Sequence, residues 1–269
     1  MTTHNPRAPV CPPLPAAIGD PSGGREHMLL AAQTGQADNR DFSDGLLLPS
    51  ASCAERNIAL ASRGHCTAHS VFGDGAGFRM QGESALENSH FYILNARPDV
   101  VEMREQVYFH YGWKRDRHHI FDVLVTFRDG SRIAYTIKPA RRTTMRMKNQ
   151  MPGEDFLTHM QMVAGWVEHL GFADDTRLLT EEDIDPVALH NAHIFAAVRE
   201  ADPKAEALAR SVVAELLGGI PLQVLTLKTG LGARGYRALL RLIRLGELIP
   251  AQGTKISPQT IVYRKGTYQ

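Results

Sequence analysis

Cysteines and long hydrophobic runs are scarce in this 269-residue chain. Its three cysteines, Cys11, Cys53 and Cys66, form no Cys-x-x-Cys pair, which excludes a disulfide framework and a standard zinc ribbon. No apolar stretch approaches the roughly 20 residues that a membrane-spanning helix needs. Residues 1–20 place no apolar segment behind a basic start, as a secretory signal would. We therefore expect a cytoplasmic protein that does not engage a membrane.

Net charge is nearly absent as well, since 30 Lys and Arg residues oppose 29 Asp and Glu residues. Taken alone, this balance argues against a nucleic-acid partner. The charges are separated along the chain, however, because residues 101–149 carry 11 basic and 5 acidic side chains and residues 204–269 carry 10 and 3. Basic segments attract phosphate locally, whatever the total charge. These two segments therefore either contact DNA or form ordinary solvated faces.

Three segments of the chain differ in composition and periodicity. Residues 1–75 are rich in Pro, Gly, Ala and Ser without a sustained period, which predicts a mostly flexible extension with short ordered pieces near Gly45–Leu48 and Ile58–Ser62. Residues 76–185 mix helix and strand patterns, which predicts an α/β domain. Residues 186–269 read as successive helices followed by a hairpin, which predicts a second domain.

Within residues 76–185, helix and hairpin signals are clear. Ser84–Asn95 has apolar residues at helical spacing, and Arg128-Asp129-Gly130 is a turn that joins two β-rich runs. The expected elements are a helix at Ser84–Asn95, short strands at Val100–Arg104 and Gln106–Tyr111, a hairpin of Ile120–Phe127 with Ser131–Ile137, a helix at Asp155–Leu170, and a strand at Arg177–Leu179 before a cap at Thr180.

The last segment carries a tight glycine turn between helices. Its expected elements are helices at residues 190–200, 204–217, 222–228 and 233–245, then strands at 247–250 and 260–264. A glycine turn that holds one helix against the next, followed by a hairpin, is the order of a winged helix-turn-helix. The helix after the turn carries an arginine stripe, which favours DNA contact over a merely amphipathic helix. The stripe is Arg234, Arg237, Arg241 and Arg244.

One group of residues has the composition of a metal-dependent hydrolytic site. Glu87 lies on the first helix, Asp122 interrupts an apolar strand, and Lys138 ends the next strand. In an antiparallel hairpin the start of one strand lies beside the end of its partner, which places Asp122 close to Thr136 and Lys138. Carboxylate oxygens suit Mg²⁺ or Mn²⁺, which can clamp a phosphate and generate hydroxide. This arrangement resembles the PD-(D/E)xK nucleases, whose core is a restriction-endonuclease-like α/β fold.

Four motifs in order strengthen the resemblance. They are Ser84-Ala85-Leu86-Glu87, the stretch from Asp99 through Gln106 (DVVEMREQ), Phe121-Asp122-Val123-Leu124-Val125, and Ile137-Lys138-Pro139-Ala140. In this order they resemble the TnsA type of transposon endonuclease, over about residues 80–185. The expected winged helix also matches a DNA-binding half that is frequent in that family.

The resemblance implies a Mg²⁺- or Mn²⁺-dependent DNA endonuclease subunit of a heteromeric transposase, which cuts the 5′ side of transposon ends beside a DDE transposase and is nucleoid-associated when acting. By the same resemblance, Glu87 and Asp122 hold the metal, Lys138 is the catalytic lysine, and Gln106 packs against or orients the site. A basic loop then faces DNA phosphate. Its residues are Arg141, Arg142, Arg146 and Lys148.

Two positions depart from the family pattern. Thr136 stands where Glu or Gln is usual, so one metal ligand is weakened, although the Ile137 backbone carbonyl can still coordinate. Phe121 replaces the proline before the central aspartate. Two alternatives to the transposase subunit stay open, the first of them suggested by Thr136. One is a catalytically weakened nuclease fold that binds DNA or assembles with a partner, and the other is a stand-alone restriction or repair nuclease.

Other polar residues near the site have weaker claims. Glu83, one turn before Glu87, is an alternative metal ligand but is expected to be solvated. His118 and His119 precede the Asp122 strand and are expected on the surface. A histidine pair follows in the last segment at helical spacing, but no third ligand accompanies it, which argues against zinc. That pair is His190 and His193.

Overall fold

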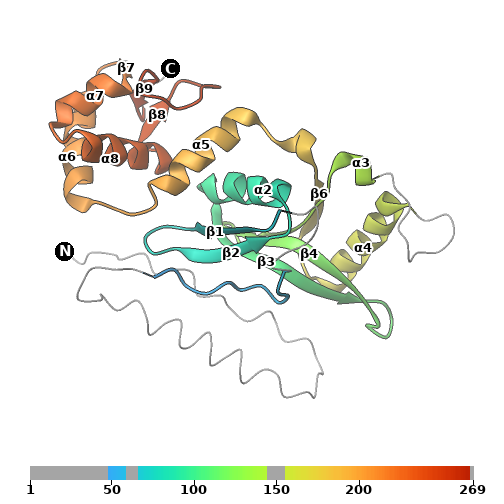
Figure 1. Ribbon diagram of the computed structural model, residues 1–269. Helices are drawn as coiled ribbons and strands as arrows, with labels where there is room; N and C mark the ends of the chain where they lie inside the picture. Colours follow the sequence, from blue (N-terminus) through green and yellow to red (C-terminus); the bar gives the residue numbers. More distant parts are fainter. Residues whose placement is uncertain (1–47, 59–65, 144–154, 267–269) are drawn as a thin grey trace.

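The computed structural model describes residues 48–58, 66–143 and 155–266 of the protein, which form a mixed α/β structure with several sheets (Figure 1). The central sheet has the strand order β3-β4-β5-β6, in which β3, β4 and β5 run antiparallel and β6 is parallel to β5. Its strands are β3 (Val100–Tyr111), β4 (Arg117–Phe127), β5 (Arg132–Ile137) and β6 (Asp175–Leu179).

Two helices cover opposite faces of this sheet, each above its own apolar core. Helix α2 (Ala85–Ala96) packs with Val123, Val125 and Ile137, whereas α4 (Phe156–Leu170) packs with Val107, Phe121 and Leu124. A two-stranded hairpin of β1 (Ala68–Phe72) and β2 (Phe78–Gly82) leads into α2 and shares its core. The two helices α2 and α4 therefore pack over separate cores.

The predicted elements of this domain are largely confirmed. Ser84 caps α2, because its hydroxyl accepts a hydrogen bond from the Glu87 amide, and Asp155 caps α4 in the same way. Gly130 adopts φ 88° in the turn between β4 and β5, a conformation that glycine accommodates without strain. Thr180 caps the short 3₁₀ helix η1 (Glu181–Asp183) with a reciprocal capping box.

The first two predicted strands are one continuous strand, β3, with an irregularity at Gln106. This residue has φ 53°, which is uncommon for a residue other than glycine. Side chains change faces there, since Met103 lies in the α2-side core and Val107 in the α4-side core. Phe121 and Val123, on either side of Asp122, change faces in the same way. The irregularity therefore spans both strands at the level of the candidate site.

Residues 48–58 run beside β3, and Glu55 accepts a 2.8 Å hydrogen bond from the Tyr108 backbone amide. Since β3 is an edge strand of the central sheet, this segment covers amides that would otherwise be open. The expected flexibility of residues 1–75 is therefore wrong for residues 48–58 and for β1. Of the two predicted ordered pieces, Leu48 and Ile58 are described, and their other residues lie outside the described part.

The C-terminal part begins with α5 (Pro186–Ala197), which packs against α2. Asp185 caps this helix and Pro186 occupies its first turn, so it starts before the predicted residue 190. A third core then joins three helices to a sheet of order β7-β9-β8. These elements are α6 (Pro203–Ala214), β7 (Ile220–Pro221), α7 (Leu222–Thr229), α8 (Ala233–Arg244), β8 (Leu248–Pro250) and β9 (Ile261–Arg264).

Gly230 and Gly232 have positive φ angles on either side of Leu231, which confirms the predicted glycine turn between α7 and α8. The predicted helix at residues 204–217 ends earlier, at Ala214. Across the described ranges, no helix combines the length and apolar composition that a membrane span requires.

Candidate functional site

Glu87 lies in the first turn of α2 with its carboxylate turned inward. The residue is only 3% exposed. Its Oε2 accepts a 2.8 Å hydrogen bond from the Glu83 amide, and its Oε1 accepts one of 2.9 Å from the Ser84 hydroxyl. Ser84, the N-cap of α2, and the Glu83 amide before it therefore supply the donors that hold the Glu87 carboxylate.

Asp122 is equally buried in the middle of β4, at 3% exposed. Its Oδ2 accepts hydrogen bonds from the Ile137 amide at 2.7 Å and from Lys138 Nζ at 3.4 Å. The prediction that the hairpin brings Asp122 to the end of β5 is confirmed. Thr136, the third member of that prediction, is buried on β5 beside Ile137.

Electrostatics link the two carboxylates. Burial, followed by the charge of Asp122, raises the pKa of Glu87 to about 7. Burial also raises the pKa of Asp122, against the opposing effect of Lys138. Lys138 is 33% exposed at its side chain and is the cation that acts on both acids. Two buried carboxylates therefore share one partly solvated lysine, and additional positive charge would stabilise their ionised forms.

The chemistry of the donors suits a hard divalent cation, although the set is small. Glu87 and Asp122 offer carboxylate oxygens, and the Ile137 backbone offers a carbonyl oxygen next to Lys138. Among the residues that the structure describes, no group of three or more His, Cys, Asp or Glu side chains could hold a metal ion. A bound metal would thus need water or substrate oxygens to complete its coordination.

Gln106 is fully buried on β3 at the level of Asp122, between the paired positions Glu105–Val123 and Val107–Phe121. Its Oε1 accepts hydrogen bonds from Arg56, of which the one from Nε measures 3.1 Å. Its Nε2 is buried without a hydrogen-bond partner in the described structure. Gln106 therefore lies at the level of Asp122 with a buried donor that no described residue satisfies, and its role in orienting the site stays a prediction.

Arg56 is a site residue that the sequence did not reveal. Besides Gln106, it contacts Glu83 through a 2.8 Å ion pair. Arg56 lies in a segment without helical or strand periodicity, so no pattern marked it. Glu83 itself is half-buried and engaged with Arg56, and its backbone amide, not its carboxylate, serves Glu87. The arrangement favours Glu87 over Glu83 as the acid of the candidate site.

A histidine that the sequence analysis did not place there contacts Thr136. His119 Nε2 lies 2.9 Å from the Thr136 hydroxyl, so that hydroxyl is engaged. Burial, and then the charges of His159, Lys138 and His118, lower the pKa of His119 to about 3. The imidazole is therefore neutral at physiological pH. His118 is exposed, as predicted, whereas His119 is half-buried on β4, so the prediction of a surface position is only partly met for His119.

The predicted basic loop is described in part. Arg141 and Arg142 lie exposed on α3 (Ala140–Thr143), a single turn directly after Lys138. The Ala140 amide donates a 2.8 Å hydrogen bond to Glu181, which fixes the start of this turn. Arg146 and Lys148 lie outside the described residues. Two of the four arginines and lysines that were predicted to contact phosphate therefore lie next to Lys138 and are exposed to solvent.

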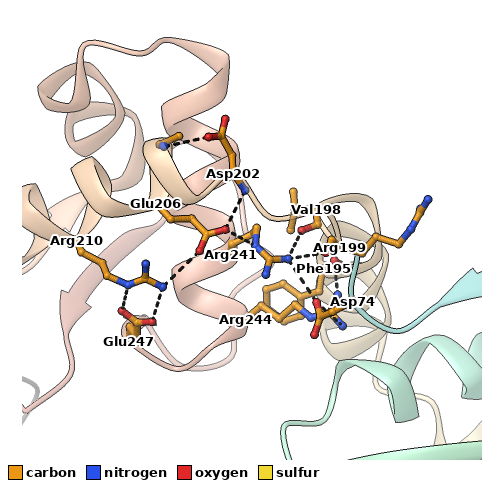
Figure 2. Close-up of polar contacts among 11 residues, drawn as sticks. Asp74, Phe195, Val198, Arg199, Asp202, Glu206, Arg210, Arg241, Arg244 and Glu247 are labelled. Atoms are coloured by element: carbon orange, nitrogen blue, oxygen red, sulfur yellow. Dashed lines mark hydrogen bonds and ion pairs between the residues drawn. The ribbon is translucent and has the colours of Figure 1, made fainter. Parts of the chain in front are cut away.

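The arginine stripe on α8 is divided between surface and interior. Arg241 is 7% exposed, and its Nε lies 2.7 Å from Glu206 while its Nη1 donates to the Val198 and Arg199 carbonyls (Figure 2). The Arg244 side chain is also buried and donates to the Phe195 carbonyl. The prediction that both arginines contact DNA is therefore wrong, because internal acceptors already bind them.

Asp74 explains why these two arginines turn inward. It lies in the turn between β1 and β2, and its Oδ1 is 3.4 Å from Arg241 Nη1 and 3.5 Å from Arg244 Nη2 (Figure 2). The other two members of the stripe, Arg234 and Arg237, are exposed, and Arg234 forms a 2.7 Å ion pair with Asp202. Only the first half of α8 therefore offers arginines to a polyanion.

The two histidines of α5 have structural contacts. His190 Nε2 lies 3.2 Å from the Ile256 carbonyl, and the ring of His193 packs 4.0 Å from that of Tyr92, measured between centroids. Both contacts join α5 to neighbouring elements.

Replacing Glu87 with glutamine is expected to stabilise the protein at alkaline pH. The folded-state pKa of about 7 exceeds the usual 4.5, so folding favours the protonated acid. That contribution is complete below about pH 4.5 and is lost as the pH rises through 7. Between pH 5.5 and 9 the wild type should lose about 2 kcal/mol relative to Glu87→Gln. Urea unfolding at both pH values measures the difference in free energy of unfolding, and Glu182→Gln, at an exposed carboxylate, is the control. Parallel pH profiles of stability for the wild type and Glu87→Gln would contradict the prediction.

A scan against protein-family models finds no match to this chain, and a search of curated proteins finds none either.

Proposed function

We propose that the protein is a metal-dependent DNA endonuclease subunit of a heteromeric transposase, with a restriction-endonuclease-like core followed by a winged helix. The observation that carries the proposal is the buried pair Glu87 and Asp122 with the partly exposed Lys138, which contacts Asp122 and acts electrostatically on both acids. Burial of two acids costs free energy unless positive charge compensates them. A site that retains this cost is a candidate for cation-dependent chemistry.

Mg²⁺ or Mn²⁺ fits the donors present, with Glu87, Asp122 and the Ile137 carbonyl as the protein ligands. When bound, the ion would supply charge neutralisation and a water of lowered pKa. Hydrogen bonds from the Glu83 and Ile137 amides hold the carboxylates in place before any ligand arrives. Such preorganisation is what a phosphodiester transition state requires, since its charge must be met without rearrangement.

Lys138 has a separate role in this proposal. Its ammonium contacts Asp122 but remains one-third exposed, so it can reach both the carboxylates and an incoming phosphate. There it would donate to a phosphate oxygen and orient the water that attacks phosphorus as the bond to the leaving oxygen breaks. Arg141 and Arg142, exposed on the next turn, would hold the adjoining backbone phosphates.

The C-terminal part supports DNA binding, but through fewer arginines than the sequence suggested. Its sheet order β7-β9-β8, with helices α6, α7 and α8, is consistent with a winged helix. The second half of α8 is buried, so DNA contact would fall to Arg234 and Arg237 in its first half. The partner DDE transposase is proposed from the family resemblance alone, through the four motifs of residues 84–140.

One observation favours a second candidate. The Thr136 hydroxyl, at the position of a usual carboxylate or amide ligand, is engaged by His119. A site with two carboxylates is weaker than one with three, so a nuclease fold that has kept DNA binding or assembly without efficient cleavage is the alternative. A stand-alone restriction or repair nuclease would use the same residues and differ only in its partner.

Calorimetric titration with Mg²⁺ and with Mn²⁺ tests the proposal. The wild type should bind at least one ion, and Glu87→Gln combined with Asp122→Asn should remove that binding, because both ligand charges are lost. Glu182→Gln removes one exposed carboxylate outside the site and is the control. DNA binding is followed in parallel by fluorescence anisotropy. Binding of DNA without binding of either ion would favour the non-catalytic alternative.

A further inference from the structure

The turn between β3 and β4 carries an unusually exposed aromatic residue. Trp113 is 88% exposed, although burying an indole is favourable. Its ring lies 5.2 Å from that of Trp166 on α4, with the planes at 80°, and 6.2 Å from that of His169. Because the two indoles are nearly perpendicular, they are not stacked on each other. Figure 1 shows this turn projecting beyond the sheet on the side of α4, away from the C-terminal helices.

The two tryptophans line a shallow apolar depression of about 300 Å³ with Met162, Gly165 and His169. A Cβ added at Gly165 would meet nothing within 4 Å, so packing does not demand glycine there. Glycine inside a helix is less favourable than alanine. Because Gly165 has no side chain, the depression stays open beside Trp166.

Cations lie close to this depression, and Arg117 Nη1 is 3.9 Å from the sulfur of Met162, which lines it. Lys114 and Arg115 are exposed on the turn with Asp116 as the acid beside them, and Arg117 is exposed at the start of β4. None of the three cations forms an ion pair in the described part of the chain. Arg115 adopts φ 51°, which holds the turn in an unusual backbone conformation. Open aromatic rings amid unpaired cations match an anionic ligand with flat apolar groups.

We propose that Trp113 and Trp166 form a platform on which an unpaired DNA base stacks, while Lys114, Arg115 and Arg117 contact the flanking phosphates. The inference rests on the proposed DNA-binding function but does not require cleavage. Aromatic side chains that stack bases beside a positively charged surface are the general means of binding single strands. The charge of the turn favours this occupant over an apolar protein segment. The ligand class is thus a single-stranded or frayed DNA end.

The chain contains two tryptophans, and both belong to the platform, so intrinsic tryptophan emission reports on it directly. The full-length protein is titrated in EDTA with a 12-nucleotide single strand and with a fully paired duplex of the same sequence. The single strand should quench the emission at low salt. Trp113→Ala should weaken single-strand binding about tenfold, measured by anisotropy, and change duplex binding by less than twofold.

A matched pair of variants separates stacking from charge and from folding. Gly165→Leu should fill the depression and weaken single-strand binding severalfold with both indoles retained, whereas Gly165→Ala should bind as the wild type does. Unquenched emission, or Trp113→Ala binding equal to the wild type, would overturn the inference. A shift of emission with protein concentration in the absence of DNA would also overturn it, because it would assign the platform to a second copy of the chain.

Failure of this inference is distinguishable from failure of the proposed function. The Asp122→Asn protein should give the same quenching as the wild type, since the titration needs no divalent cation. Nicking activity with no base stacking would leave the nuclease proposal standing without the platform. Quenching by the single strand in a protein that never nicks would support the platform on a DNA-binding protein.

Discussion

Asp122→Asn is expected to slow Mg²⁺- or Mn²⁺-dependent nicking of supercoiled DNA roughly a thousandfold, the scale on which the loss of one preorganised electrostatic group acts. The asparagine oxygen can still accept the hydrogen bond that the Ile137 amide donates at 2.7 Å. The change therefore removes the negative charge of the proposed ligand beside Lys138 while it keeps the contact with the Ile137 amide. The initial rate of conversion from supercoiled to open circular DNA is the measurement.

Stability serves as the control for this variant. Burial raises the pKa of Asp122, so the folded protein carries the ionised form at a cost. Asparagine should leave the free energy of unfolding unchanged or increase it, even though activity is lost. Glu182→Gln, which removes an exposed carboxylate, should nick at the wild-type rate. An Asp122→Asn protein that is folded and nicks as fast as the wild type would refute the assignment of the site.

Arg241→Ala is expected to destabilise the protein by about 3–5 kcal/mol, the usual effect of breaking a buried ion pair from one side. Glu206 would lose the guanidinium 2.7 Å away while it remains buried, and the Val198 and Arg199 carbonyls would lose their donor. Urea unfolding followed by circular dichroism measures the change.

Arg234→Ala is the matched control for Arg241→Ala, because it removes an arginine of the same helix from an exposed pair with Asp202. Exposed pairs contribute roughly 0–1 kcal/mol, so this variant should unfold almost as the wild type does. The double variant Arg241→Met with Glu206→Leu should recover most of the loss, since both charges leave the interior together. Equal destabilisation by Arg241→Ala and Arg234→Ala would show that the inward contacts are unimportant.

Local signals made much of the fold predictable. Ser84 before an apolar period and Pro98 after it mark the limits of α2, and Gly130 marks the hairpin that delivers Asp122 to Lys138. These features act over a few residues, so the sequence displays them directly. The pairing of Asp122 with the end of β5 follows from hairpin geometry, which explains why the two catalytic candidates on the hairpin were found together.

Long-range contacts were not predictable in this way. The spacing of the arginines on α8 gave no sign that Asp74, 167 residues from Arg241, would draw two of them inward. Nothing in residues 48–58 marked Arg56 as a partner of Gln106. His119 was misplaced because the predicted strand began at Ile120, whereas β4 begins at Arg117 and places the ring of His119 4.8 Å from that of Phe121, between centroids.

That exchange of faces has a consequence for how the site could change during evolution. At Gln106 and Asp122 the side chains of β3 and β4 change from one face of the sheet to the other. The packing of both apolar cores therefore affects the same short stretch of backbone. Substitutions in the core under α2 and in the core under α4 would both shift the carboxylate of Asp122, in the first case also through Ile137, whose amide binds it. Laboratory selection for altered activity should therefore recover mutations scattered through both layers, with few of them at the acids themselves.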